Sequence, residues 1–92
     1  MYVVVHHRVT NRDRFLATSP EDIGGNAPAG VQVRHFLPAK DASAADCLWE
    51  VESFDALRDY LDPALRGIAE NTYFEVDSAL AMGLPESAFA KA

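Results

Sequence analysis

Residues 2–9 have the sequence YVVVHHRV, a run rich in β-branched and aromatic residues. Such residues favour extended backbone, and neither glycine nor proline interrupts them. This composition is typical of a central strand, and Thr10 or Asn11 then offers an oxygen that can cap a helix. We therefore expect a strand over residues 2–9 with a helix directly after it.

The segment after this strand predicts a helix that is broken near Ser19. Residues 12–18 suit a first helical piece, and residues 19–22, SPED, supply a new cap, a proline at the first position and an acidic first turn. Residues 24–30, GGNAPAG, are dense in residues that interrupt regular structure. We expect a loop there, leading into a second strand over residues 31–37.

A β-hairpin is predicted next. Pro38 ends the second strand, and residues 40–43, KDAS, can reverse the chain into a third strand over residues 46–52, DCLWEVE. The two strands should therefore pair in antiparallel fashion.

The second helix is predicted to begin after Ser53, with Phe54, Leu57 and Leu61 on one face. Pro63 should end one helical segment and start a short second one, because proline cannot continue an α-helix unperturbed. A fourth strand is expected over residues 72–77.

The fold class that this order predicts is α+β, with a ferredoxin-like βαββαβ arrangement. Right-handed crossovers give a four-stranded antiparallel sheet with both helices on one face and strand one between strands three and four. Residues 1–82 would form this domain, and residues 83–92 a C-terminal tail whose Phe89 docks on the domain or on a partner.

Composition and charge limit the classes of partner. The chain of 92 residues has a net charge of −6, so no broad positive field is present to attract nucleic acid or anionic lipid. The single cysteine excludes an intrachain disulfide, and no signal peptide or membrane-spanning run is evident, which predicts a cytoplasmic protein. A domain of this size has a thin core, so self-association is expected.

Side-chain alternation along the strands predicts two faces of the sheet. The helix-covered face should carry the more apolar set: Val3, Val5, Val9, Val31, Val33, Leu37, Cys47, Trp49, Val51, Phe74 and Val76. The open face should carry a mixed set: Tyr2, Val4, His6, Arg8, Gln32, Arg34, Phe36, Leu48, Glu50, Glu52, Tyr73, Glu75 and Asp77.

The open face contains the chemically suggestive residues. His6 between Glu50 and Glu75 would act as a general acid or base while Arg34 holds an anionic group. The competing and favoured interpretation is that these charges form cross-strand pairs. No cofactor is predicted, but His6, Glu50 and Glu75 would also be an alternative set of ligands for a divalent metal such as nickel.

Two histidines and the cysteine are expected to be structural. His7 and His35 fall on the predicted helix face, where a backbone group would satisfy them. Cys47 has no evident base or second cysteine in the sequence and should be a buried thiol.

Three short motifs carry a resemblance to a known superfamily. The opening Tyr2-Val-Val-Val-His6, the third strand Cys47-Leu-Trp-Glu50 and the fourth strand Tyr73-Phe-Glu75-Val resemble the dimeric α/β-barrel superfamily over most of residues 1–82. The His-strand and Cys-x-x-Glu pattern is similar to small uncharacterised proteins, some of them similar to a nickel-binding protein.

The resemblance implies a homodimer in which two open sheet faces enclose a small hydrophobic ligand. We therefore expect a small-molecule-binding homodimer, with ligand contacts from Tyr2, Phe36, Glu50, Tyr73 and Glu75. The alternatives are a cofactor-independent monooxygenase, cyclase or isomerase that uses His6 and Arg34 on an aromatic or polyketide-like substrate, and a divalent-metal-binding protein. Fold alone does not choose the chemistry.

Overall fold

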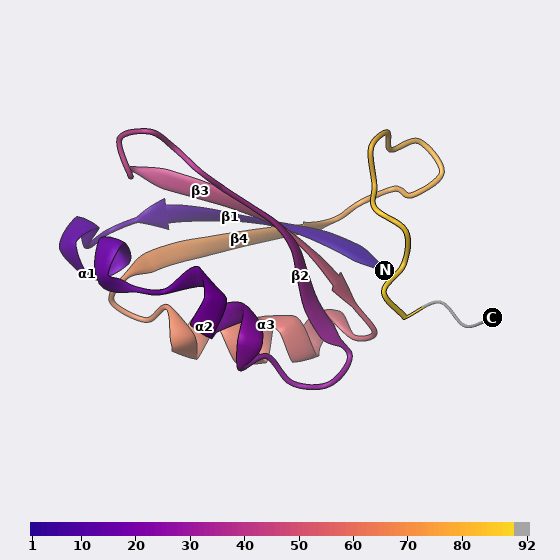
Figure 1. Cartoon of the computed structure of the whole chain (residues 1–92), viewed down its shortest axis with the longest axis horizontal. Helices are drawn as coiled ribbons and strands as arrows, with labels where there is room; N and C mark the ends of the chain where they lie inside the picture. The colour runs from indigo at the N-terminus through magenta and orange to yellow at the C-terminus, as the bar shows by residue number, and fades with distance from the viewer. Residues whose placement is uncertain (90–92) are drawn as a thin grey trace.

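The computed structural model describes residues 1–89, and all regular elements lie within residues 2–75. Their order along the chain is β1 (Tyr2–Val9), α1 (Arg12–Ala17), α2 (Pro20–Gly25), β2 (Val31–Pro38), β3 (Ala44–Val51), α3 (Phe54–Ala64) and β4 (Ala69–Glu75). The strands form one four-stranded sheet in the order β2-β3-β1-β4, with every pair antiparallel. The three helices lie together on one side of this sheet (Figure 1). The predicted α+β class and the position of β1 between β3 and β4 are confirmed.

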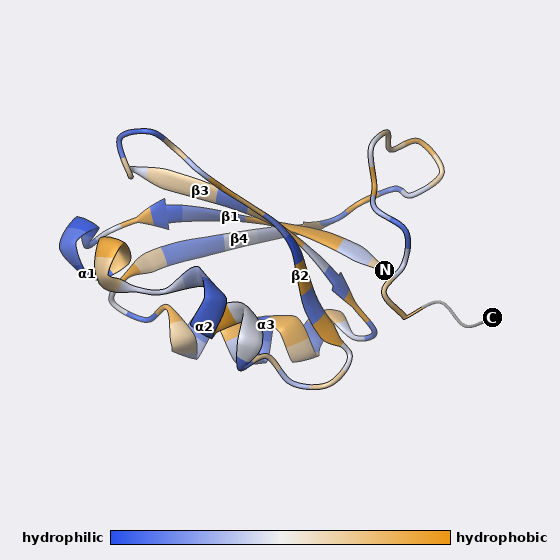
Figure 2. Cartoon of the chain, in the orientation of Figure 1, coloured by the Kyte–Doolittle hydropathy of each residue, from blue (hydrophilic) through white to orange (hydrophobic). Residues whose placement is uncertain are grey.

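β1 is one of the two inner strands of the sheet, and two of its inward-facing residues are branched and apolar. Val3 and Val5 have no exposed surface and lie opposite Trp49 and Cys47 of β3. In Figure 2 the half of β1 nearer the N-terminus is mainly hydrophobic, and the half nearer its C-terminal end is mainly hydrophilic. The predicted bounds of this strand are confirmed.

α1 and α2 are two separate short helices, as the sequence predicts. The Asn11 side chain accepts a hydrogen bond from the Arg14 amide, and the Ser19 hydroxyl accepts one from the Asp22 amide. The prediction of a loop at Gly24 and Gly25 is wrong, because α2 runs through both of them. The Tyr60 hydroxyl of α3 donates to the Ile23 carbonyl at 2.5 Å, which holds α2 over the sheet.

α3 covers the centre of the sheet and buries Leu57 and Leu61. The prediction that Pro63 divides this helix is wrong. Pro63 lies within its last turn, where a single backbone hydrogen bond is lost, and the helix ends at Ala64. Gly67 then takes a φ of +74°, a conformation that glycine adopts without strain, and β4 begins at Ala69 rather than at residue 72.

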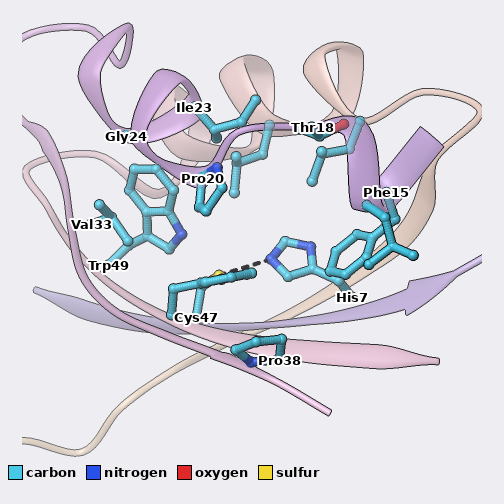
Figure 3. Close-up of a pocket in the computed structure, with 14 residues that line it drawn as sticks. His7, Phe15, Thr18, Pro20, Ile23, Gly24, Val33, Pro38, Cys47 and Trp49 are labelled. Atoms are coloured by element: carbon cyan, nitrogen blue, oxygen red, sulfur yellow. Dashed lines mark hydrogen bonds between the residues drawn. The ribbon is translucent and has the colours of Figure 1, made fainter. Parts of the chain in front are cut away.

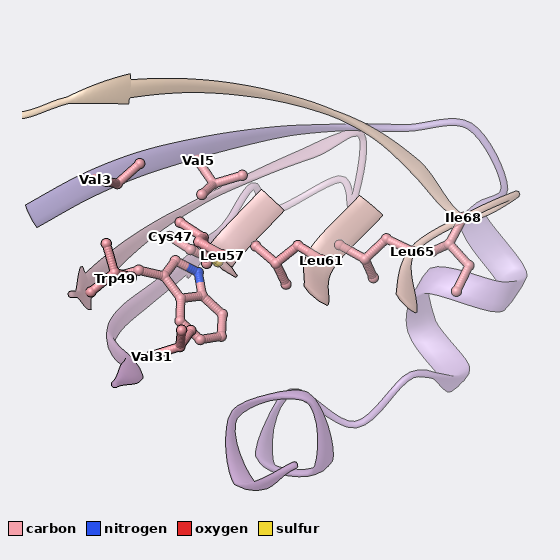
Figure 4. Packing of buried hydrophobic residues seen from close by; sticks show 10 residues of the cluster. Val3, Val5, Val31, Cys47, Trp49, Leu57, Leu61, Leu65 and Ile68 are labelled. Carbon is pink, nitrogen blue, oxygen red and sulfur yellow. The ribbon is translucent and has the colours of Figure 1, made fainter. Parts of the chain in front are cut away.

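The core lies between the helices and the sheet (Figure 4). Its buried side chains come from β1, β2 and β3, from α3 and from the segment that follows α3. They are Val3, Val5, Val31, Cys47, Trp49, Val51, Leu57, Leu61, Leu65 and Ile68.

In β2 and β4, several side chains lie on the face of the sheet opposite to the one predicted. The pairing of β2 with β3 shifts between Val33 and His35, so Phe36 lies opposite Cys47 on the helix face, whereas His35 lies opposite Leu48 on the open face. A β-bulge of this kind inserts one residue and reverses the alternation beyond it. The predicted placement of Phe36 on the open face and of His35 and Leu37 on the helix face is therefore wrong.

The side chains of β4 also point to the faces opposite to those predicted. Tyr73 lies opposite Val5, and Glu75 lies opposite Val3, so both belong to the helix face, while Phe74 lies opposite Val4 on the open face. The physical reason is that Tyr73 packs on the core and its hydroxyl donates to Asp62 of α3 at 2.5 Å. The predicted placement of Tyr73 and Glu75 on the open face and of Phe74 on the helix face is therefore wrong.

The chain after β4 returns to the open face near the N-terminus (Figure 1). The Tyr2 hydroxyl donates to the Pro85 carbonyl at 2.7 Å. The division into a domain of residues 1–82 and a tail of residues 83–92 stays a prediction, and residues 90–92 lie outside the described part. Among residues 1–89, no helix has the length and apolar character needed to cross a membrane.

Candidate functional site

The open face holds an exposed ion pair of Arg8 with Glu70 and two further polar groups. In the first, His6 Nδ1 lies 2.6 Å from Asp46 Oδ1, and both side chains are about half exposed, with 51% and 55% of their surface accessible. A shallow depression of about 230 Å³ lies beside this pair. An exposed pair of this kind contributes little to stability.

The second polar group is centred on Glu50, which is only 3% exposed. Its Oε1 accepts from Arg34 Nη1 at 2.8 Å and from the Ala88 amide at 2.7 Å, and its Oε2 accepts from the Ser87 hydroxyl. Burial alone raises the pKa of Glu50, but these hydrogen bonds outweigh it and the pKa lies below its ordinary value. Arg34 also donates to the Glu86 carbonyl at 2.8 Å. The group therefore fastens residues 86–88 to the sheet.

The structure does not bring the predicted open-face site together. His6 lies opposite Asp46, whereas Glu50 lies opposite Tyr2, four residues further along β1, which is roughly 13 Å. Glu75 is on the other face of the sheet. No cluster of three or more His, Cys, Asp or Glu residues within residues 1–89 is placed to hold a metal ion. The catalytic roles of His6 and Arg34 and the metal set His6, Glu50 and Glu75 stay predictions.

A larger cavity lies on the opposite side of the sheet, between the helices and the strands (Figure 3). Its volume is about 270 Å³. Most of the lining is apolar, and it includes Phe15, Leu16, Ile23, Val33, Phe36 and Trp49. Leu16 is 58% exposed and Phe36 37% exposed, so the cavity opens to the surface between α1 and β2.

Three polar groups on the sheet face this cavity or support a group that does. His7 Nε2 lies 3.2 Å from Cys47 Sγ, and His7 Nδ1 lies 2.6 Å from Asn71 Oδ1. His7 is 4% exposed and Cys47 7% exposed. The register explains the arrangement, because His7 lies directly opposite Asn71 of β4 and diagonally across from Cys47 of β3.

Hydrogen bonds beyond Asn71 determine which nitrogen of His7 carries the proton. Asn71 Nδ2 donates to Asp62 Oδ1 at 3.0 Å, and because a carboxylate only accepts, the amide oxygen must face His7. That oxygen accepts from Nδ1–H, so Nε2 presents its lone pair to the Cys47 thiol. The thiol proton therefore points to His7.

Burial keeps the His7 imidazole and the Cys47 thiol neutral. Burial is the main cause that lowers the pKa of His7, partly offset by the hydrogen bond to Asn71. Burial, reinforced by the negative charge of Asp46, raises the pKa of Cys47 to about 12. The site therefore holds a neutral thiol hydrogen-bonded to a neutral imidazole near pH 7.

Trp49 adds a donor to the same cavity. It is 2% exposed, and its indole N–H has no hydrogen-bond acceptor within residues 1–89, although it lies close enough to the Cys47 sulfur to favour the thiolate slightly. Figure 3 shows the indole nitrogen on the side of the ring that faces Cys47 and His7.

Comparison with known proteins assigns no family. No protein-family model matches the chain, and no curated protein or solved structure matches it. The assignment of a function therefore depends on the geometry of the two faces.

The sequence does not predict the group of His7, Cys47 and Asn71, although it does predict the face on which two of its members lie. His7 and Cys47 were both placed on the helix face, and adjacent strands carry them, so their proximity follows once the register is known. Asn71 was missed because the fourth strand was expected to begin at residue 72. Nothing local in the sequence indicates that β4 reaches back to Ala69.

We expect the lowered pKa of His7 to make the fold sensitive to acid. Below the ordinary pKa of 6.5, the unfolded chain binds a proton at His7 that the folded chain does not bind. The free energy of unfolding should therefore decrease as the pH falls from 6.5 towards the folded-state pKa, by at most about 1.4 kcal/mol per pH unit.

Urea unfolding at several pH values between about pH 5 and pH 7.5 measures this slope. His7→Gln should remove most of it, and His35→Gln, which replaces an exposed histidine, is the matched control. A slope that is the same in all three proteins would contradict the assignment to His7.

Proposed function

We propose that this chain binds a small, neutral, apolar molecule in the cavity between the helices and the sheet. The observation that carries this proposal is the cavity itself, about 270 Å³ in volume, apolar in most of its lining and open to the surface. Concave sites with an apolar lining and few polar groups are the usual form of small-molecule sites in proteins.

The lining also supports a chemical class for the ligand. The cavity has no acidic residue, lysine or arginine in its lining, and burial favours the neutral form of His7, so a charged ligand would have no counter-ion. The indole N–H of Trp49 has no acceptor within the described chain, and a buried donor without a partner costs about 1–3 kcal/mol. A ligand with one carbonyl oxygen relieves that cost.

An NMR titration tests this proposal with a matched pair of ligands. Acetophenone carries a carbonyl group, and α-methylstyrene has the same shape without the oxygen. Trp49 is the single tryptophan, so its indole N–H gives one signal. We expect acetophenone to shift that signal saturably and to bind about tenfold more tightly than α-methylstyrene, which corresponds to one hydrogen bond.

A matched protein variant completes the design. Trp49→Phe removes the N–H and keeps an aromatic ring, so it should abolish the preference for the ketone. The methyl signal of Ile23, which lines the cavity, reports binding in that variant, and Ile68, in the core but outside the lining, is the control. No saturable shift at Trp49 or Ile23 with either ligand would disprove the proposal.

We also propose that the fold is ferredoxin-like, that the chain belongs to the dimeric α/β-barrel superfamily and that it forms a homodimer through its open face. The order of the elements and the central position of β1 support the first two points. An apolar row across the open face supports the third: Phe74 is 59% exposed, and Val4 and Leu48 lie beside it in register. A ligand between the two sheets of such a dimer stays a prediction.

A further inference from the structure

The helix-side cavity contains the parts of a nucleophilic site, and the proposed function does not use them. Cys47 Sγ lies 3.2 Å from His7 Nε2, and His7 Nδ1 lies 2.6 Å from Asn71 Oδ1. A nucleophile, a base and a group that orients the base are the arrangement by which cysteine and serine acyl-transfer enzymes activate their nucleophiles. Both Cys47 and His7 line the cavity.

A second observation is a hydrogen-bond donor beside the thiol that lacks an acceptor within the described chain. The indole N–H of Trp49 is buried, faces the cavity side of Cys47 and has no acceptor within residues 1–89 (Figure 3). A donor aimed at the oxygen of a carbonyl group stabilises the negative charge that develops there when a nucleophile attacks. The site therefore has a thiol, a base and one oxyanion donor.

We propose that Cys47 accepts the acyl group of a small, neutral, apolar ester bound in this cavity. This inference depends on the proposed binding function, because the ester must first occupy the same apolar space. The lining predicts the substrate class: an ester of a short aliphatic or aromatic acid, without charge.

The step is balanced without an additional reactant. Cys47 Sγ attacks the carbonyl carbon while its proton passes to His7 Nε2, and the Trp49 N–H donates to the carbonyl oxygen. The S–C bond forms, the C–O bond to the alcohol breaks, and the proton on His7 leaves with the alcohol. Asn71, itself bound to Asp62 at 3.0 Å, is a positioning residue that keeps Nε2 free to accept the proton.

The electrostatics of the site require the base. Burial raises the pKa of Cys47 to about 12, so an unassisted thiolate would be scarce at pH 7. The groups that influence His7 are Asn71 on β4, Cys47 and Asp46 on β3 and His6 on β1, and Asp62 of α3 lies behind Asn71. Reaction through His7 should reach a plateau above the lowered pKa of His7, whereas reaction of a free thiolate would keep rising tenfold per pH unit.

The test uses 4-nitrophenyl butyrate with the whole chain. Wild type should release 4-nitrophenolate in a burst of one equivalent per chain, and mass spectrometry should find one butyryl group on Cys47, the single cysteine. Hydroxylamine should remove the group, as expected for a thioester. The burst rate should be flat between about pH 7 and pH 9.

Matched variants separate the roles. His7→Gln should slow the burst by about a hundredfold or more, the range for loss of a general base. Asn71→Ala should slow it and should shift the pH at which the plateau begins, and His35→Gln should leave it unchanged. Cys47→Ser, close to the cysteine in shape, should give no thioester while its Trp49 signal confirms that the chain is folded.

The outcomes distinguish this inference from the binding proposal. Saturable binding of acetophenone without acylation of Cys47 would overturn the acyl-transfer inference alone. Acylation at equal rates in wild type and His7→Gln, or acylation at another residue, would also overturn it. If neither ketone binding nor acylation is found, both proposals fail.

Discussion

Leu57→Ala is expected to reduce the free energy of unfolding by about 2–5 kcal/mol. Leu57 is a residue of α3 with no exposed surface, belongs to the core and is outside the cavity lining, so its truncation leaves a void. A domain of this size has a total stability of about 5–10 kcal/mol. The change should therefore remove a large fraction of it.

Thermal unfolding followed by circular dichroism measures this effect. In a domain of this length, each kcal/mol corresponds to a shift in Tm of about 4–8 °C. Leu80→Ala is the matched control, because Leu80 is 80% exposed and its loss should change the free energy of unfolding by less than about 0.5 kcal/mol. Equal melting temperatures for the two variants would contradict the position of the core.

Phe74→Glu is expected to convert a homodimer into a monomer. In the proposed dimer, Phe74 lies in the apolar row at the centre of the interface, and a carboxylate there would be buried without a partner. An aromatic residue at the centre of an interface carries a large share of the binding energy, so the dissociation constant should rise by more than about a hundredfold.

Analytical ultracentrifugation at micromolar concentration measures the oligomeric state. Leu80→Glu adds the same charge to an exposed site after β4, outside the sheet, and should leave the dimer intact. If wild type sediments as a monomer, the dimer proposal is wrong, and the open face is then covered by residues 85–88 at one end only.

The sequence predicts the fold well where local composition strongly favours one kind of element. β1 is rich in β-branched and aromatic residues and contains no glycine or proline, so its bounds and its inner position in the sheet follow from the residues. The caps at Asn11, Ser19 and Ser53 are also evident, because each side-chain oxygen directly precedes a helical segment. These elements are determined by local chemistry.

The errors arise where tertiary contacts override the local pattern. The sequence around Arg34 gives no local indication of the bulge that places Phe36 on the helix face and Leu37 on the open face. In β4, each of the two faces has an aromatic residue, Tyr73 on one and Phe74 on the other. The hydrogen bond from Tyr73 to Asp62 determines which of them faces the helices. Of the residues predicted to cluster on the open face, Glu75 lies on the other face for this reason, whereas His6 and Glu50 share the face but lie opposite Asp46 and Tyr2 in the register of β1 with β3.

The candidate site shows the same limit. The sequence supplied His7 and Cys47 on the correct face, but the base, its orienting amide and the unsatisfied indole N–H became a site only with the register of three strands. A thiol without a base in the neighbouring sequence was interpreted as structural. Its base comes from a strand about forty residues away in the chain.

The most direct test of the central claim is a structure of the protein in complex with acetophenone. We predict the ring between α2 and the sheet, with the ketone oxygen at hydrogen-bond distance from the Trp49 indole nitrogen. A ligand bound on the open face or between two sheets, with the helix-side cavity empty, would contradict the assignment of the binding site.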